Sequence, residues 1–151
     1  MKKLTLLFAA FIMVLSMHAQ SSKQVKWSWS AKKIGDKTYE VHLTANIIGD
    51  YHLYAQDAGG EGPVPTTFTF SKNPLFNLEG NVKEVGKQVK KFESAWSHDV
   101  KYYENTVDFV QVVKLKGNAK TNLAGKVEFM VCNNEKCLPP ADVNFQVGIG
   151  G

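Results

Sequence analysis

Apolar and polar residues alternate along most of the chain beyond its first 24 positions. The segment Tyr39–Ile47 is the clearest case: every second residue is apolar, and Glu40, His42 and Thr44 stand between them. A period of two residues is typical of a β-strand that buries one face. The same kind of pattern predicts further strands at residues 25–31, 51–54, 67–70, 76–82, 106–115, 125–132 and 142–147.

Turn-forming residues separate these segments, most densely in the stretch Ala58–Pro65. Residues 83–92 are ambiguous, because Val85, Val89 and Phe92 fit one face of a helix as well as a broken strand. No helix of convincing length is expected after the N-terminal segment. Many short strands at this spacing predict an all-β fold, an immunoglobulin-like antiparallel β-sandwich in a single domain.

The first 19 residues have the composition of an export signal. Two lysines at the start precede an almost unbroken apolar run over residues 4–17, and Ala19 offers a small residue at a cleavage point. The run is shorter than the roughly 20 apolar residues that span a bilayer. We therefore expect a cleaved signal peptide at residues 1–19 and a folded domain at residues 20–151. The domain is expected in the periplasm, soluble and without stable membrane insertion.

Composition narrows the classes of partner. Removing 19 of the 151 residues leaves 132, enough for one domain with its own core, and lowers the net charge from +4 to +2. All the basic side chains are lysines. Proteins that bind nucleic acids usually exploit the planar guanidinium group of arginine, so no nucleic-acid partner is expected.

The only two cysteines, Cys132 and Cys137, lie near the C-terminus and are followed by Pro139-Pro140. In an exported domain such a pair commonly forms a structural disulfide. A loop this short, however, restricts the unfolded chain by only about 2 kcal/mol, against about 4.7 kcal/mol for a loop of about a hundred residues. Reversible thiol–disulfide exchange is the other interpretation, because it requires one accessible sulfur and a second nearby to resolve the mixed disulfide. Spacing alone leaves both interpretations open.

Neither a metal nor a cofactor is expected. The cysteine spacing is not part of a four-ligand zinc set, and a metal site would have to recruit His42, His52 or His98 from elsewhere. His42 falls on the polar face of its segment, where a solvated side chain is the simpler interpretation. The stretch Gly59–Gly62 resembles a phosphate-binding loop only in glycine content, since it lacks Gly-Lys-Ser/Thr and precedes prolines rather than a helix.

The segment Cys132–Pro140, with Leu138-Pro139-Pro140 behind the second cysteine, resembles the active-site region of the N-terminal periplasmic domain of DsbD-type thiol:disulfide interchange proteins. Gly49–Tyr54 resembles the family's turn and aromatic strand, and Gly62–Thr66 is similar to a variant in its homologues. The resemblance implies an immunoglobulin-like fold with the two cysteines on neighbouring strands. It also implies an electron relay, connected with cytochrome c biogenesis, from the thioredoxin-like domain of a membrane reductase to periplasmic thiol proteins.

The resemblance further implies roles for side chains around the cysteines. In the family a cap loop shields the cysteines with an aromatic residue, and the matching position here is Trp96; an ordinary core tryptophan is the alternative. Tyr51 and Tyr54 are expected to line the face on which partners dock, with Pro139 and Pro140 beside the cysteines.

Two departures from the family pattern stand out. This chain has one residue fewer between its cysteines, so the hairpin geometry is expected to differ. Ser94 and Ala95 replace the acidic residues expected just before the cap aromatic, which argues against proton transfer assisted by those carboxylates.

We therefore predict an exported thiol–disulfide exchange domain with protein-disulfide reductase activity, whose catalytic residues are Cys132 and Cys137. A partner thiolate attacks one sulfur of the resting disulfide, and Cys137 is favoured because the proline turn should leave it nearer the surface. The expected partners are a membrane thiol reductase and thioredoxin-like periplasmic proteins, both separate chains. The alternative is a non-catalytic secreted β-sandwich, a binding or structural module in which the disulfide is a static clip.

Overall fold

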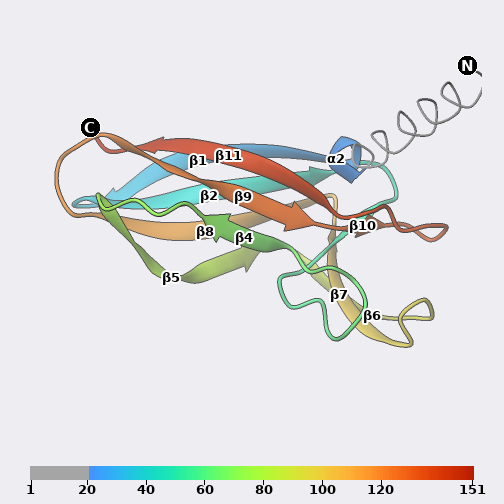
Figure 1. Ribbon diagram of the computed structural model, residues 1–151. Helices are drawn as coiled ribbons and strands as arrows, with labels where there is room; N and C mark the ends of the chain where they lie inside the picture. The colour runs from blue at the N-terminus through green and yellow to red at the C-terminus, as the bar shows by residue number, and fades with distance from the viewer. Residues whose placement is uncertain (1–20) are drawn as a thin grey trace, which may run out of the picture.

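The computed structural model describes residues 21–151, so the expected signal peptide at residues 1–19 lies outside the described residues. Apart from one helical turn, α2 (Ser21–Gln24), the regular structure in this range is β (Figure 1). No helix within it is long and apolar enough to cross a membrane. The strands are β1 (Val25–Gly35), β2 (Thr38–Ile47), β3 (His52–Tyr54), β4 (Thr67–Phe70), β5 (Phe76–Val85), β6 (Gln88–Glu93), β7 (His98–Glu104), β8 (Thr106–Leu115), β9 (Thr121–Phe129), β10 (Val131–Cys132) and β11 (Ala141–Ile149).

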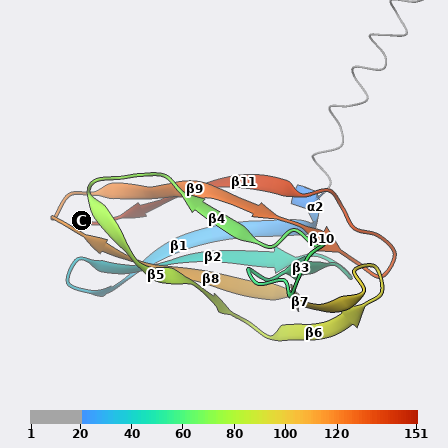
Figure 2. The ribbon, with the colours of Figure 1, turned by 60° about the horizontal axis from the view of Figure 1, so that its bottom comes forward.

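Two antiparallel sheets face one another and enclose the main core (Figures 1 and 2). The strand order is β1-β2-β8-β5 in one sheet and β11-β9-β4 in the other. Aromatic rings join the two sheets: Trp27 on β1 lies 5.5 Å from Phe129 on β9, and Phe109 on β8 lies 5.0 Å from Phe68 on β4, measured between ring centres. This is the antiparallel β-sandwich that the alternating pattern predicts.

Strand β2 shows how the sequence builds this sandwich. Val41, Leu43 and Ala45 point inward and are no more than 1 % exposed, because alternate side chains of a strand share a face. On the outer face His42 is half-buried rather than simply solvated. Its Nδ1 atom lies 2.6 Å from the carboxylate of Asp108 on the neighbouring strand β8, so this histidine belongs to a cross-strand pair.

A third sheet, in the order β10-β3-β7-β6, forms one end of the molecule (Figures 1 and 2). Leu53, Tyr103 and Val131 on one of its faces belong to the main core. The other face carries a second group of buried side chains, which we call the end cluster: Tyr54, Ala58, Val100, Tyr102, Met130 and Cys132. Because β10 pairs with β3, Cys132 stands directly opposite His52.

The ambiguous segment 83–92 is extended, so its helical interpretation is wrong. Residues 83–85 end β5 and pair with β8, and β6 begins at Gln88 and pairs with β7. Val85 and Phe92 are 58 % and 60 % exposed, so two of the three apolar positions that fitted a helical face are not buried.

The strand pattern also differs from the expectation in one divided strand and in one strand that was not predicted. The predicted strand 125–132 is divided, because β9 leaves its partner β11 after Phe129 and the chain then pairs with β3 as β10. Strand β7 was not predicted, because its sequence does not alternate cleanly. Its adjacent tyrosines, Tyr102 and Tyr103, are both buried, one in the end cluster and the other in the main core.

Candidate functional site

The two cysteines form a disulfide that closes a tight hairpin loop. Their Cα atoms are 4.0 Å apart, and they pair as an isolated antiparallel bridge at the end of β10. Asn133 organises the four residues between them. Its backbone N–H donates to the Lys136 carbonyl at 2.9 Å, and its side-chain oxygen accepts from the backbone N–H groups of Glu135 and Lys136. This side-chain mimic of a turn allows the short loop to close.

The two sulfur-bearing residues differ sharply in exposure. Cys132 is 1 % exposed and belongs to the end cluster, whereas Cys137 is exposed. Leu138 anchors the chain behind Cys137, since its side chain is buried in the main core and its N–H donates to the Val131 carbonyl at 2.9 Å. One sulfur is therefore held in the protein and the other is presented at the surface.

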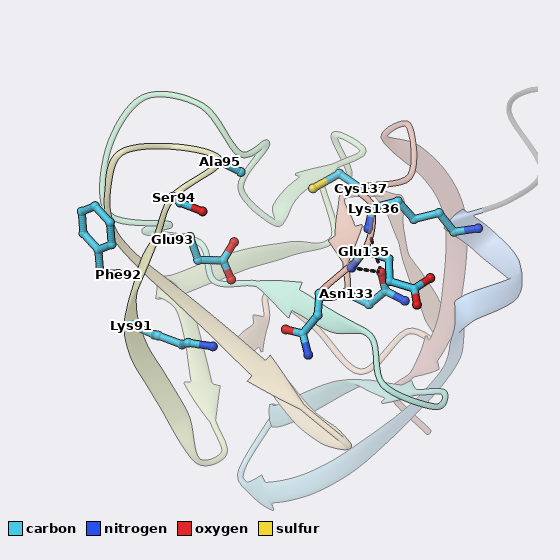
Figure 3. A pocket seen from close by; sticks show the side chains of 10 residues that line it. Lys91, Phe92, Glu93, Ser94, Ala95, Asn133, Glu135, Lys136 and Cys137 are labelled. Carbon is cyan, nitrogen blue, oxygen red and sulfur yellow. Dashed lines mark hydrogen bonds between the residues drawn. The ribbon is translucent and has the colours of Figure 1, made fainter.

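Cys137 lines an open cleft of about 520 Å³ between two segments. One wall is residues 91–95 at the end of β6, and the other is the cysteine loop, residues 133–137. Figure 3 shows the Cys137 sulfur and the Glu93 carboxylate directed into this space, while the ring of Phe92 points away from it. An attacking group that enters the cleft thus meets the exposed sulfur.

The tip of the β6–β7 hairpin, residues 94–97, places Trp96 against the end cluster. Its indole Nε1–H donates to the Tyr54 hydroxyl at 3.0 Å, and its backbone N–H donates to the Glu93 carbonyl at 3.1 Å. Trp96 is half-buried at a hairpin tip, outside the main core of the sandwich. The structure therefore brings it to the group of side chains that contains Cys132.

Tyr54 lies beneath Trp96 and is fully buried, so it does not present a surface to partners as the sequence suggested. Its hydroxyl donates to the Glu93 carboxylate at 3.4 Å. Burial is the largest of the effects that raise the pKa of Tyr54 to about 12, which keeps the phenol neutral. Tyr51 is half-exposed and packs against the main core, and Pro139 and Pro140 are exposed just beyond Cys137.

His52 is the functional candidate that sequence reasoning passed over, having considered it only as a metal ligand. It is 6 % exposed, and its ring centre lies 4.2 Å from that of Tyr102. Its Nε2 atom is 3.4 Å from the Tyr54 hydroxyl and 3.5 Å from the Glu93 carboxylate. Burial, reinforced by the positive charge of Lys91, lowers the pKa of His52 to about 4. The imidazole is therefore neutral at neutral pH.

The sequence does contain a signal that His52 and Tyr54 lie together. Period-two alternation places His52 and Tyr54 on one face of β3, but nothing in the sequence shows that β10 pairs there or that Glu93 approaches from β6. Glu93 is also the acidic side chain nearest in sequence to Ser94 and Ala95, where carboxylates were expected. The hairpin therefore does carry a carboxylate, one or two positions before the residues where acidic side chains were expected.

The glycine-rich stretch 58–65, which we call the glycine loop, supports the hairpin tip from behind. Gly62 has φ +131°, and a Cβ at this position would overlap the ring of Trp96. A Cβ on Gly60 would lie 2.9 Å from the ring of His98. Glycine is therefore required for close approach to aromatic rings, and the phosphate-loop interpretation has no support here.

His98 fastens the same loop to the start of β7. Its Nε2 atom lies 2.7 Å from the Glu61 carbonyl, and its Nδ1 atom lies 2.8 Å from the Asp99 carbonyl. A neutral imidazole has one N–H, so only the protonated ring donates to both oxygens. The Asp99 carbonyl, followed by the Glu61 carbonyl, raises the pKa of His98. Within residues 21–151 no group of three His, Cys, Asp or Glu side chains is arranged to hold a metal ion.

Comparison with known proteins places this geometry in a family. Residues 18–148 match the family described as "Thiol:disulfide interchange protein DsbD, N-terminal". The chain belongs to this family. The resemblance carried by Cys132–Pro140 is thereby confirmed, and the match covers nearly all of the sequence. No curated protein matches the chain in a direct sequence comparison.

Two solved structures share the fold of this DsbD N-terminal family member. The N-terminal domain of DsbD from Neisseria meningitidis, in its reduced form, superposes with a TM-score of 0.55 and 15% identity, covering 86% of this chain and 89% of that one. The N-terminal periplasmic domain of ScsB from Proteus mirabilis gives a TM-score of 0.52 and 13% identity, covering 83% of this chain but 44% of that one. These likenesses confirm the immunoglobulin-like sandwich and concern the fold alone.

Proposed function

We propose that this protein exchanges disulfides with thiol proteins in the periplasm and relays electrons through the Cys132–Cys137 pair. The observation that carries the proposal is the position of Cys137, which is exposed in the cleft while its bonded partner is buried. Exchange requires one sulfur that can be attacked and a second that stays close enough to resolve the mixed disulfide. The family's description as a thiol:disulfide interchange protein supports the same chemistry.

The reaction begins with the oxidised protein. A partner thiolate attacks the Cys137 sulfur, a bond forms between the two proteins, and the bonding electron pair of the disulfide leaves on Cys132. The partner's second thiol then attacks its own sulfur in the mixed disulfide and releases Cys137. The partner is oxidised to a disulfide, and this protein holds two thiols. The same steps in reverse reduce an oxidised acceptor.

Attack at Cys137 rather than Cys132 follows from access. Cys132 is 1 % exposed and lies among the side chains against which Trp96 packs, so an incoming protein cannot reach it without displacing the hairpin tip. We propose that Trp96 caps the site in this way until a partner docks. The hydrogen bond to Tyr54 and the glycine loop behind the ring hold the cap closed.

The proposed partners are thioredoxin-like proteins and a membrane thiol reductase. The solved ScsB domain is described as periplasmic, and residues 1–19 have the pattern of an export signal, which supports a periplasmic location for this chain. Mass measurement of the mature protein from the periplasm would locate the cleavage site, expected after Ala19.

Trapping of mixed disulfides tests the proposal, with the two single-cysteine variants as a matched pair. Cys132→Ser keeps the exposed thiol but removes the one that resolves the mixed disulfide, so covalent complexes with thioredoxin-like partners should accumulate. Cys137→Ser keeps only the buried thiol and should trap far less. The complexes are detected on non-reducing gels of periplasmic extract, and mass spectrometry identifies the peptide joined to Cys137.

The outcome separates this proposal from the alternative of a static disulfide in a binding module. An exchange protein gives complexes that disappear on treatment with a thiol reductant and that depend on Cys137. Absence of any adduct from Cys132→Ser, in the presence of an oxidised thioredoxin-like protein, contradicts the proposal. Equal trapping by both variants contradicts the assignment of Cys137 as the attacked sulfur.

A further inference from the structure

The proposed exchange reaction requires a proton at a buried sulfur. When a thiolate attacks Cys137, the leaving electron pair resides on Cys132, which is 1 % exposed among apolar and aromatic side chains. Burial away from water disfavours a thiolate, so this sulfur must gain a proton as the bond breaks and lose one when the disulfide re-forms. The following inference rests on that proposed function.

His52 is placed to exchange this proton with Cys132. The two residues are directly opposite in the antiparallel pair of β3 and β10. Side chains at directly opposed positions lie on the same face of a sheet, with Cβ atoms about 4.5–5.5 Å apart. The packing of the His52 ring on Tyr102 fixes its orientation on that face.

On its other side, His52 approaches a residue that lines the cleft. Its Nε2 atom lies 3.5 Å from the carboxylate of Glu93, and Glu93 lines the same cleft as Cys137 (Figure 3). The Glu93 side chain is 18% exposed against 7% for His52, so the pair runs from the interior to a solvent-accessible group. The titratable groups that face His52 from its own strand, β6, β7 and β10 are Tyr54, Lys91, Glu93, Tyr102, Glu104 and Cys132.

We propose that His52 and Glu93 carry a proton between the buried Cys132 sulfur and the cleft. On reduction, a proton from the cleft passes through Glu93 to the neutral His52 ring, and the resulting imidazolium gives it to the Cys132 sulfur as the sulfur–sulfur bond breaks. On oxidation, His52 accepts the Cys132 proton, the resulting thiolate attacks the mixed disulfide at Cys137, and the partner leaves as a thiolate. The proton passes out through Glu93.

The protonation of the resting site agrees with this assignment. Burial lowers the pKa of His52 to about 4, so the ring is neutral at neutral pH and has a free lone pair to accept a proton. Protonated His52 is then a stronger acid than a cysteine thiol, so it gives its proton up readily to a neighbouring thiolate. The Tyr54 hydroxyl, with a pKa near 12, hydrogen-bonds in the same cluster without ionising.

Reduction of the disulfide by a water-soluble phosphine tests this role, because the phosphine attacks without ionisation of a thiol. The second-order rate constant is measured in H₂O and in D₂O for the wild type, His52→Gln and Glu93→Gln. Glutamine keeps a polar side chain of similar reach but does not carry a proton. We expect both variants to react about a hundredfold more slowly and to lose the solvent isotope effect of the wild type.

His42→Gln is the matched control, since His42 lies on the outer face of β2 in a different sheet and should leave the rate unchanged. Thermal unfolding confirms that each variant is folded. If His52→Gln does not fold, the kinetics of Glu93→Gln alone decide the test, because Glu93 lines the open cleft and its substitution should leave the fold intact.

Three results would overturn the assignment. If both variants react at the wild-type rate with the wild-type isotope effect, proton transfer through His52 and Glu93 is excluded, while the exchange function is unaffected. A slow His52→Gln variant that keeps the full isotope effect shows that His52 acts by packing alone. A wild-type disulfide that neither the phosphine nor reduced thioredoxin opens removes the proposed function, and this inference with it.

Discussion

The indole nitrogen of Trp96 lies 3.0 Å from the hydroxyl of Tyr54, and this hydrogen bond joins the tip of the β6–β7 hairpin to the strand that faces Cys132. The two residues are separated by 42 positions in sequence. Tyr54 is fully buried and Trp96 is half-buried, so the bond is partly shielded from water and the phenol gives the tip a fixed point of attachment. Access to the disulfide should therefore depend on how firmly Trp96 is held.

Replacing Trp96 with alanine should expose the end cluster and speed the reduction of the disulfide by dithiothreitol. The indole packs against the cluster that contains Cys132, and its removal leaves that side open. Stopped-flow measurement of the reduction rate provides the check. Trp29→Ala is the control, because Trp29 is 36 % exposed on β1 and contacts Phe145 in the sandwich. Equal rates for both variants would mean that Trp96 does not restrict access.

Substitution of Gly62 by alanine should displace the Trp96 ring from behind. Gly62 and Gly80 both have positive φ, at +131° and +69°, so alanine is strained at either site and should cost more than about 1 kcal/mol. Only at Gly62 would the new Cβ also overlap the indole. We expect Gly62→Ala to speed disulfide reduction and Gly80→Ala to lower stability without that change. Denaturant unfolding and reduction kinetics on the same samples separate the two effects.

The double hydrogen bond of His98 should make the attachment of the glycine loop depend on pH. The pKa of His98 is raised by its two carbonyl acceptors, so its stabilising effect is complete below the ordinary value of 6.5 and is lost as pH rises through the raised pKa. Amide protection factors at Gly60 and Gly62 should fall over that interval in the wild type. In His98→Gln they should not vary with pH. An NMR titration of the imidazole that gives a pKa below 6.5 would exclude this arrangement.

His52 should lower the free energy of unfolding as the pH falls, whereas the attachment made by His98 is lost as the pH rises. Its pKa is lowered from 6.5 to about 4, so on acidification the unfolded chain takes up a proton before the folded protein does. The free energy of unfolding contributed at this site is therefore intact above pH 6.5 and is lost between about pH 6.5 and 4, by at most about 3 kcal/mol. Denaturant unfolding of wild type and His52→Gln over this range should show a difference that depends on pH. A constant difference would contradict the assigned pKa.

The sequence predicted the sandwich because its strands obey one simple rule. Strand β2 alternates over ten residues, and each inward side chain is buried in the main core. The third sheet follows a different rule, since both of its faces are covered. Neighbouring residues such as Tyr102 and Tyr103 are then both buried, and period-two reasoning cannot locate β7.

The candidate site was predictable only in part, for a related reason. Cys132 and Cys137 stand out in the sequence by their chemistry and by the prolines behind them. His52, Glu93 and Gly62 acquire a role only from contacts between segments far apart in the chain. The spacing of residues along one strand carries no information about such contacts, so the structure was needed to find them.

The equilibrium reduction potential of the Cys132–Cys137 disulfide tests the central claim most directly. The oxidised protein is equilibrated with dithiothreitol or glutathione redox buffers, and the fraction of free thiol is read after alkylation by mass spectrometry. An exchange protein should have a potential above about −300 mV, in the range of thioredoxin-like carriers. A value well below about −300 mV would mark a static structural bond and contradict the account.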